Sequence, residues 1–141
     1  MSGVKLTDIV EKMNLKNLTP EVDITEREVL VPDVNRPALQ LAGFFDHFDL
    51  NRVQIIGNVE CAYLETLEEE KRVEIYQKLL EHKVPCIIFS NELQPDESFI
   101  EIAQKNDIPV FGTCKKTSSF MGELIRWLNV KLAPCISIHG V

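Results

Sequence analysis

The chain has 141 residues, of which 45% are hydrophobic and 26% are charged, a composition typical of one globular domain and not of a disordered chain. Its 22 acidic residues outnumber its 15 basic ones, and the net charge of −7 disfavours a nucleic-acid partner. No stretch approaches the ~20 apolar residues that a membrane span needs, and the N-terminus has no apolar signal-peptide run. We therefore expect neither a nucleic-acid nor a membrane partner.

The four cysteines, Cys61, Cys86, Cys114 and Cys135, are widely spaced and include no C-x-x-C pair. Structural zinc sites usually bring their ligands in close pairs, so we expect no metal site. Without a secretory signal, this pattern is typical of free thiols in a reducing cytoplasm. The sequence therefore predicts a cytoplasmic protein whose cysteines are reduced and buried.

The first half of the chain begins with apolar residues at helical spacing, which predict a helix over 5–14. Residues 28–31 form a short strand pattern. The next helix is predicted to begin at Pro37, with Asn35 as its cap, and to end near Phe48.

Buried-strand patterns follow at 53–57, 86–89 and 109–112. Helices are predicted between them, over 65–83 and from Asp96 onward. Continuous apolar strands that alternate with helices indicate an α/β fold with a mainly parallel sheet flanked by helices.

The last predicted helix begins at Thr117 or Ser118, either of which can cap it, and ends before Pro134. Its inward stripe consists of Met121, Leu124, Ile125, Leu128 and Leu132. Trp127 lies off this stripe, and we interpret it as a contact with a further domain. Residues 136–138 resemble the start of one more strand.

In open α/β sheets, ligands bind beyond the carboxyl ends of the strands. Three predicted strands end at 57–58, 90–91 and 112–113, and the third leads into the last helix. Around the start of that helix lie Lys115, Lys116, Thr117 and Ser118. Unpaired backbone N–H groups at a helix N-terminus favour anions. The segment is therefore either an ordinary capped turn with solvated lysines or a weak site for phosphate or a sugar phosphate.

Several catalytic motifs are absent from the sequence. It contains no G-x-x-x-x-G-K-[ST] phosphate loop, no G-x-G-x-x-G turn and no G-x-S-x-G nucleophile elbow. The three histidines, His47, His82 and His139, lie far apart. Without a catalytic constellation, the residues alone indicate a binding or regulatory α/β domain.

Three segments resemble one known family. Residues 36–45 read RPALQLAGFF and resemble the RPGLxLxGFF segment of HPr kinase/phosphorylases. Residues 52–60, RVQIIGNVE, are similar to that family's RVQLLGxxE, and residues 132–141, LAPCISIHGV, are similar to its LAxxxSxHGV. Order and spacing also fit, so the resemblance covers essentially the whole chain.

The resemblance implies an N-terminal domain over residues 1–134, similar in fold to the substrate-recognition domain of the Mur ligases. Residues 135–141 would then begin the connection to a catalytic phosphate-loop domain beyond this chain. His139 matches the histidine commonly assigned to the family's active site, and we expect it to be inert in this chain alone.

Members of the family are bacterial hexamers that use ATP and magnesium to phosphorylate a serine of HPr, the phosphocarrier of the sugar phosphotransferase system. They also remove that phosphate by attack of inorganic phosphate, and they act in carbon catabolite control. The resemblance thus implies three partners, namely the kinase domain, HPr and further copies of the chain. It implies no cofactor in this chain itself.

Two functions from different classes remain. The chain is either the accessory domain of this serine kinase/phosphorylase or a free-standing ligand-sensing module of the DRTGG type. The Asp-Arg-Thr-Gly-Gly signature of that module is absent, which favours the accessory domain. Because phosphoryl transfer needs a nucleotide site and metal ligands, we expect no ATP-dependent kinase activity from the chain alone.

Overall fold

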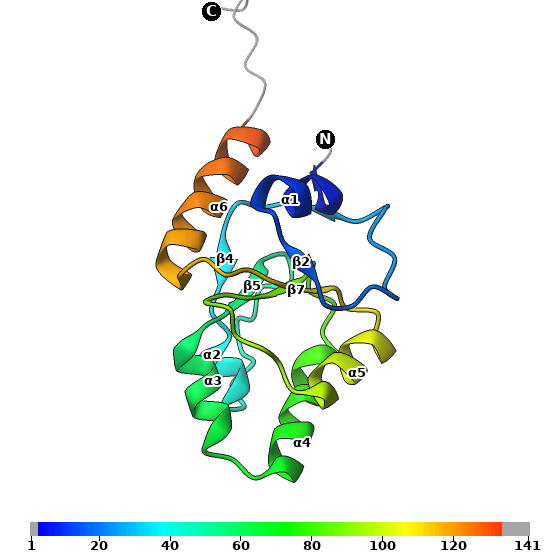
Figure 1. The fold of residues 1–141 in the computed structure, drawn as a ribbon, viewed down its shortest axis with the longest axis vertical. Coiled ribbons are helices and arrows are strands. Elements are labelled where there is room, and N and C mark those ends of the chain that lie inside the picture. Colours follow the sequence, from blue (N-terminus) through cyan, green and yellow to red (C-terminus); the bar gives the residue numbers. More distant parts are fainter. Residues whose placement is uncertain (1–2, 134–141) are drawn as a thin grey trace, which may run out of the picture.

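The computed structural model describes residues 3–133. Its centre is a five-stranded sheet in the order β2-β7-β6-β5-β4 (Figure 1). The strands are β2 Lys16–Asn17, β4 Val34–Asn35, β5 Val53–Ile56, β6 Ile87–Phe89 and β7 Val110–Gly112. Strands β4 to β7 pair in parallel, and β2 runs antiparallel along β7. The predicted α/β class with a mainly parallel sheet is confirmed.

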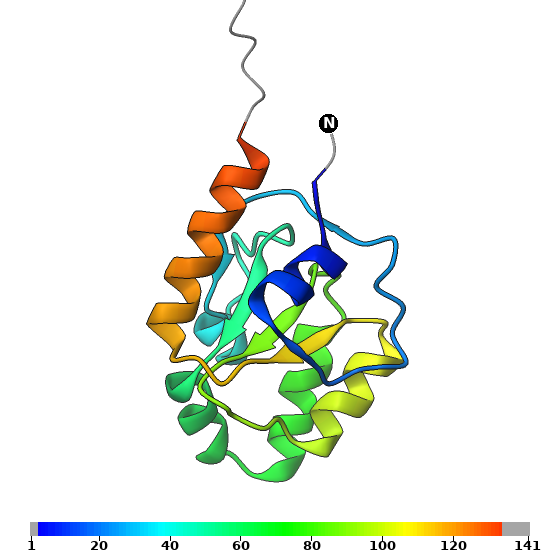
Figure 2. The same ribbon diagram turned by 45° about the horizontal axis from the view of Figure 1, so that its top comes forward.

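Two layers of helices cover this sheet. The helices are α1 Leu6–Met13, α2 Ala38–Leu41, α3 Asn58–Glu65, α4 Glu69–Leu80, α5 Glu97–Lys105 and α6 Thr117–Leu132. Figures 1 and 2 show α1 and α6 on one side of the sheet and α2 to α5 on the other.

None of the helices within residues 3–133 is long and apolar enough to cross a membrane. Beside α1, β1 Val4–Lys5 pairs antiparallel with β3 Glu28–Val29, so the strand predicted over 28–31 is present but shorter.

Side chains of the parallel strands alternate between two cores, as the pleat of a strand requires. The core under α1 and α6 receives Val53, Ile55, Cys86, Ile88 and Phe111. The core under α2 to α5 receives Ile56, Ile87, Phe89 and Val110. Because the sheet is buried on both faces, its strands appear in the sequence as continuous apolar runs.

The segment before α2 differs from the prediction. Asn35 does not cap a helix but ends strand β4, where its Nδ2 donates to Oε1 of the fully buried Gln54 at 2.7 Å and to Oε1 of Gln40 at 3.1 Å. A buried amide needs such partners, and this requirement outweighs the local preference of Asn for a cap.

Helix α2 ends at Leu41, whereas the sequence predicted an end near Phe48. Gly43 has a φ of +100°, and the backbone N–H of Phe44 donates to the Leu39 carbonyl at 2.9 Å. This bond and the left-handed glycine form a Schellman turn, which satisfies the last carbonyls of the helix and stops it.

Helix α3 was not predicted, and the helix predicted over 65–83 is the shorter α4. Only Glu60 and Leu64 of α3 are buried, so the segment has no apolar stripe of helical period. Its first turn is stabilised by the Glu60 carboxylate, which accepts a hydrogen bond from the Gly57 N–H at 2.8 Å.

Lys116 occupies the N-cap position of helix α6 without a capping hydrogen bond from its side chain, so Thr117 is the first residue of the helix and not its cap. Its buried residues are Phe120, Leu124 and Leu128. Trp127 is half-buried against the same core, with the Lys131 ammonium 5.8 Å from its ring centre. Its contact with a further domain stays a prediction.

The cysteines divide into three environments. Cys86 is fully buried as predicted, Cys61 is half-buried, and Cys114 is exposed, which makes the prediction wrong for Cys114. All three are free thiols, and burial raises the pKa of Cys86 to about 12. Cys135, the strand expected at 136–138, His139 and the expected connection over 135–141 lie outside the described residues.

Candidate functional site at the carboxyl edge of the sheet

The four parallel strands bring the residues that follow them to one edge of the sheet. Arg36 follows β4, Asn58 lies just beyond β5, Asn91 lies just beyond β6, and Thr113 follows β7. Helix α6 starts at the same edge, because only a four-residue turn separates it from β7 (Figure 1). This is the edge at which open α/β sheets bind ligands.

An open hollow of about 460 Å³ lies at this edge. It is lined by Arg36, Asn58, Val59, Asn91, Lys116, Thr117 and Ser118. Three of the four residues proposed from the sequence as an anion site, Lys116, Thr117 and Ser118, therefore face the same space as the two asparagines at the strand ends.

The first turn of α6 is held against the ends of β5 and β6. Thr117 Oγ1 lies 2.6 Å from Ser90 Oγ, and the Asn91 N–H donates to the Lys115 carbonyl at 2.8 Å. A Cβ at Gly57 would lie 2.7 Å from Thr117 Oγ1, closer than side chains tolerate. The glycine is therefore required by the close approach of the helix.

Arg36 reaches the hollow from the end of β4 and is anchored by Glu60. The guanidinium donates from Nε to Oε2 at 2.9 Å and from Nη2 to Oε1 at 2.6 Å. The Glu60 carboxylate is 2% exposed, while the Arg36 side chain is 31% exposed. The buried acid thus fixes the arginine by a two-point contact and compensates its charge, while Nη1 has no hydrogen-bond partner among residues 3–133.

The two neighbouring lysines behave differently. Lys115 turns its ammonium to Glu123 on α6 at 2.5 Å, and this bond lowers the pKa of the Glu123 carboxyl. The Lys115 side chain therefore does not line the hollow. Lys116 lines it and forms no ion pair with any residue between 3 and 133.

Arg36 was not proposed as a site residue from the sequence, because the two-residue strand β4 was not predicted. A strand that ends at Asn35 would have placed Arg36 at the carboxyl edge by the same rule that identified the other positions. Val31 and Val34, separated by a proline and an aspartate, give too short an apolar pattern for that assignment.

The chemistry of this edge favours binding over catalysis. The residues lining the hollow include an ammonium, a guanidinium, two hydroxyls and two amides, but no histidine, cysteine or carboxylate. Among residues 3–133, no three His, Cys, Asp or Glu side chains lie close enough to hold a metal ion. His139, the active-site residue implied by the resemblance, is not among the described residues.

Comparison with known proteins gives consistent matches. The family model described as HPr Serine kinase N terminus matches residues 4–128. The HPr kinase/phosphorylase of Lachnoclostridium phytofermentans is 56% identical over 141 residues, which cover 100% of this chain and 46% of the relative. The HPr kinase/phosphorylase of Caldicellulosiruptor bescii is 41% identical over 132 residues, which cover 94% of this chain and 42% of the relative. The chain thus spans about half the length of the curated relatives it matches.

Among solved structures, the CBS and DRTGG domains of the regulatory region of Clostridium perfringens pyrophosphatase, complexed with the activator diadenosine tetraphosphate, are similar in fold. The TM-score is 0.62 at 22% identity, covering 89% of this chain and 47% of the other. This likeness concerns the fold, whereas the sequence matches identify the family. The chain belongs to the HPr serine kinase N-terminus family and corresponds to the N-terminal part of HPr kinase/phosphorylases.

Proposed function

We propose that the chain is the accessory, regulatory domain of a bifunctional HPr kinase/phosphorylase, which phosphorylates and dephosphorylates a serine of HPr in carbon catabolite control. The observation that supports this most strongly is the family match over residues 4–128. The chemistry would then be performed by the other half of the enzyme, with which this domain associates, and the whole enzyme would assemble from several copies.

The residue types of this domain support a role in which the domain itself does not catalyse the reaction. The sequence contains no phosphate loop, and no group suited to a metal ion occurs between residues 3 and 133. ATP, magnesium and the HPr serine would therefore be bound outside this domain, since phosphoryl transfer depends on positioned phosphates and metal ions.

A phosphorylation assay tests this assignment. The chain is incubated with HPr, magnesium and ATP, and the whole L. phytofermentans enzyme serves as the positive control. We expect no incorporation of phosphate into HPr serine above a blank without enzyme. Turnover that persists through re-purification of the chain would contradict the proposal.

Within this role, the hollow at the carboxyl edge would bind a small anion such as phosphate or a sugar phosphate. The first turn of the 16-residue helix α6 points free N–H groups outward, and Lys116, Thr117 and Ser118 add one positive charge and two hydroxyls. Nη1 of Arg36, which has no hydrogen-bond partner among residues 3–133, adds a further donor. Because exposed charges are screened by water and salt, the expected dissociation constant lies between high micromolar and millimolar, on the order of 1 mM.

A ligand-sensing module of the DRTGG type is the second candidate, and the fold likeness to the pyrophosphatase regulatory region favours it. Isothermal titration with diadenosine tetraphosphate separates the two candidates. Binding tighter than about 10 μM, weakened in Lys116→Ala, would support the sensing module, because an accessory domain with a weak phosphate hollow predicts no such affinity.

A further inference from the structure

A second hollow lies on the opposite side of the sheet from α6, between α3, α4, α5 and the loop that follows β6. It is separate from the carboxyl-edge hollow and shares none of its lining residues. Its volume is about 220 Å³. An apolar cavity of about 150 Å³ accommodates a benzene ring, so this space is large enough for one ring with a short substituent.

One part of its wall is apolar and rigid. Leu64, Phe89, Leu93 and Phe99 contribute to the lining. The Phe99 ring packs edge to face against Phe89 at 5.2 Å and against Tyr76 at 5.1 Å, measured between ring centres. Such pairs fix the orientation of the rings, and the cavity is therefore present without a ligand.

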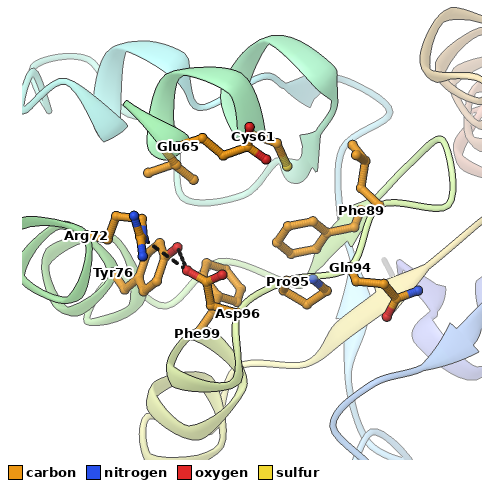
Figure 3. A pocket seen from close by; sticks show the side chains of 11 residues that line it. Cys61, Glu65, Arg72, Tyr76, Phe89, Gln94, Pro95, Asp96 and Phe99 are labelled. Carbon is orange, nitrogen blue, oxygen red and sulfur yellow. Dashed lines mark hydrogen bonds and ion pairs between the residues drawn. The ribbon is translucent and has the colours of Figure 1, made fainter. Parts of the chain in front are cut away.

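The other part of the wall is polar, and its central residue is Asp96. This aspartate occupies the N-cap position of α5, yet its side chain does not cap the helix. Instead, Oδ2 accepts hydrogen bonds from Tyr76 Oη at 2.5 Å and from Arg72 Nε at 3.2 Å (Figure 3). Oδ1 has no hydrogen-bond partner within residues 3–133 and so remains available to a ligand.

The charges around the cavity favour a cation. Figure 3 shows Glu65 and Cys61 of α3 on the side of the space opposite Asp96. The guanidinium of Arg72 is already engaged by Asp96 and by the Leu67 carbonyl at 2.6 Å. Burial, followed by the negative charges of Glu60, Glu65 and Asp96, raises the pKa of the Cys61 thiol to about 11. The lining carries two carboxylates, Glu65 and Asp96, against the one guanidinium of Arg72, and this excess of negative charge disfavours an anionic ligand.

We propose that this cavity is a binding site for a small amine with a single apolar ring. The ring would pack between Leu64, Phe89 and Phe99, and the ammonium would lie between the open oxygen of Asp96 and the carboxylate of Glu65. The site is independent of the phosphate hollow and of the assignment to the kinase/phosphorylase.

The test uses three probes of nearly equal size that differ in charge, namely benzylamine, benzyl alcohol and benzoate. Each is titrated into the ¹⁵N-labelled full chain at pH 7, and amide shifts are followed. We expect saturable shifts confined to residues 61–65 and 89–99, with benzylamine binding most tightly and benzoate giving no saturable shift up to about 20 mM.

Asp96→Asn should weaken benzylamine about two- to fivefold, the range of a partly exposed ion pair, and leave benzyl alcohol unchanged. Benzyl alcohol binding thereby shows that the variant is folded. Glu97→Gln is the matched control, because it removes the same charge from the next residue in the chain. The Glu97 side chain does not line the cavity, so this variant should not alter benzylamine binding. Tighter binding of benzoate, equal weakening in both variants, or the absence of saturable benzylamine shifts in these residues would each overturn the proposal.

Discussion

The two faces of the central sheet differ in what they bury besides apolar side chains. Under α1 and α6, the core is a continuous apolar cluster from Val4 to Leu128. Under α2 to α5, a second apolar cluster of similar size lies next to the buried polar side chains of Gln40, Gln54 and Glu60. The first face therefore contributes mainly packing, whereas the second also contains interactions that require particular partners.

These polar interactions join segments that are distant in sequence. Asn35 bonds Gln54, Arg36 pairs with Glu60, and Tyr76 donates to Asp96. Every buried side-chain polar atom among the described residues has a partner. Because an unpaired buried group costs about 1–3 kcal/mol, these pairs restrict how the strand ends and helices can be arranged. The comparison indicates that the apolar face stabilises the domain and that the polar face positions its edge and its pockets.

The largest expected loss of stability comes from substitutions in the two cores, which test whether both faces of the sheet are equally well packed. Ile87 and Ile88 are neighbours in β6, are both fully buried, and point to opposite faces. We expect Ile87→Ala and Ile88→Ala each to lower the free energy of unfolding by about 2–5 kcal/mol, measured by urea denaturation. A cost below about 1 kcal/mol for either variant would show that its face is not a tightly packed core.

The next largest loss of stability is expected from breaking a buried polar pair. Glu60→Ala removes a buried carboxylate and leaves the Arg36 guanidinium and the Gly57 N–H without their acceptor. Since Arg36 can still reach water, we expect a loss at the lower end of the range for broken buried pairs, about 3 kcal/mol in urea denaturation.

Glu74→Ala is the control for this measurement. It breaks the pair with Lys71, in which both side chains are more than half exposed, and it should leave the free energy of unfolding close to that of the wild type. Similar losses in the two variants would mean that the burial of Glu60 has no special role.

The same comparison explains how much could be predicted from the sequence. Strands β5, β6 and β7 were predicted because their apolar residues form continuous runs, and helices α1, α4, α5 and α6 were predicted because theirs recur at helical spacing. Helix α3 and strand β4 were missed because each has too few apolar residues to form a recognisable pattern. Glu60 of α3 and Asn35 of β4 are polar, and their role depends on partners about 20 residues away.

The carboxyl edge was predicted in part, because the strands that lead to it were recognised from their apolar residues. Asn58, Asn91 and Thr117 follow recognisable strands, and the structure brings them to one hollow. Lys115 points to Glu123, whereas Lys116 faces the hollow. This difference depends on the directions of the two side chains in the turn, and two adjacent lysines in a sequence give no information about those directions.

A smaller effect tests the hydrogen bond between Tyr76 and Asp96. Tyr76→Phe removes one charge-assisted bond, and because Asp96 is 46% exposed we expect a loss of about 1 kcal/mol at pH 7, measured by urea denaturation. Burial and the hydrogen bond to Asp96 raise the pKa of Tyr76 above its usual value of about 10.

The raised pKa also predicts a dependence on pH. Above about pH 10, the unfolded chain loses the Tyr76 proton while the folded chain keeps it, so the stability from this group is present below pH 10 and declines as the pH rises. The difference in unfolding free energy between wild type and Tyr76→Phe should therefore shrink from pH 9.5 to pH 11. A difference that stays constant or grows over this interval would contradict the raised pKa.

The most direct test of the account is whether the carboxyl edge binds an anion through Lys116. Inorganic phosphate is titrated into the ¹⁵N-labelled chain, and wild type is compared with Lys116→Ala and Lys115→Ala, two variants that remove the same charge. We predict shifts concentrated in the amides of residues 113–119, with binding weakened about two- to fivefold in Lys116→Ala and close to wild type in Lys115→Ala. Absent shifts, or equal behaviour of the two variants, would contradict the assignment of this edge as the binding surface of the domain.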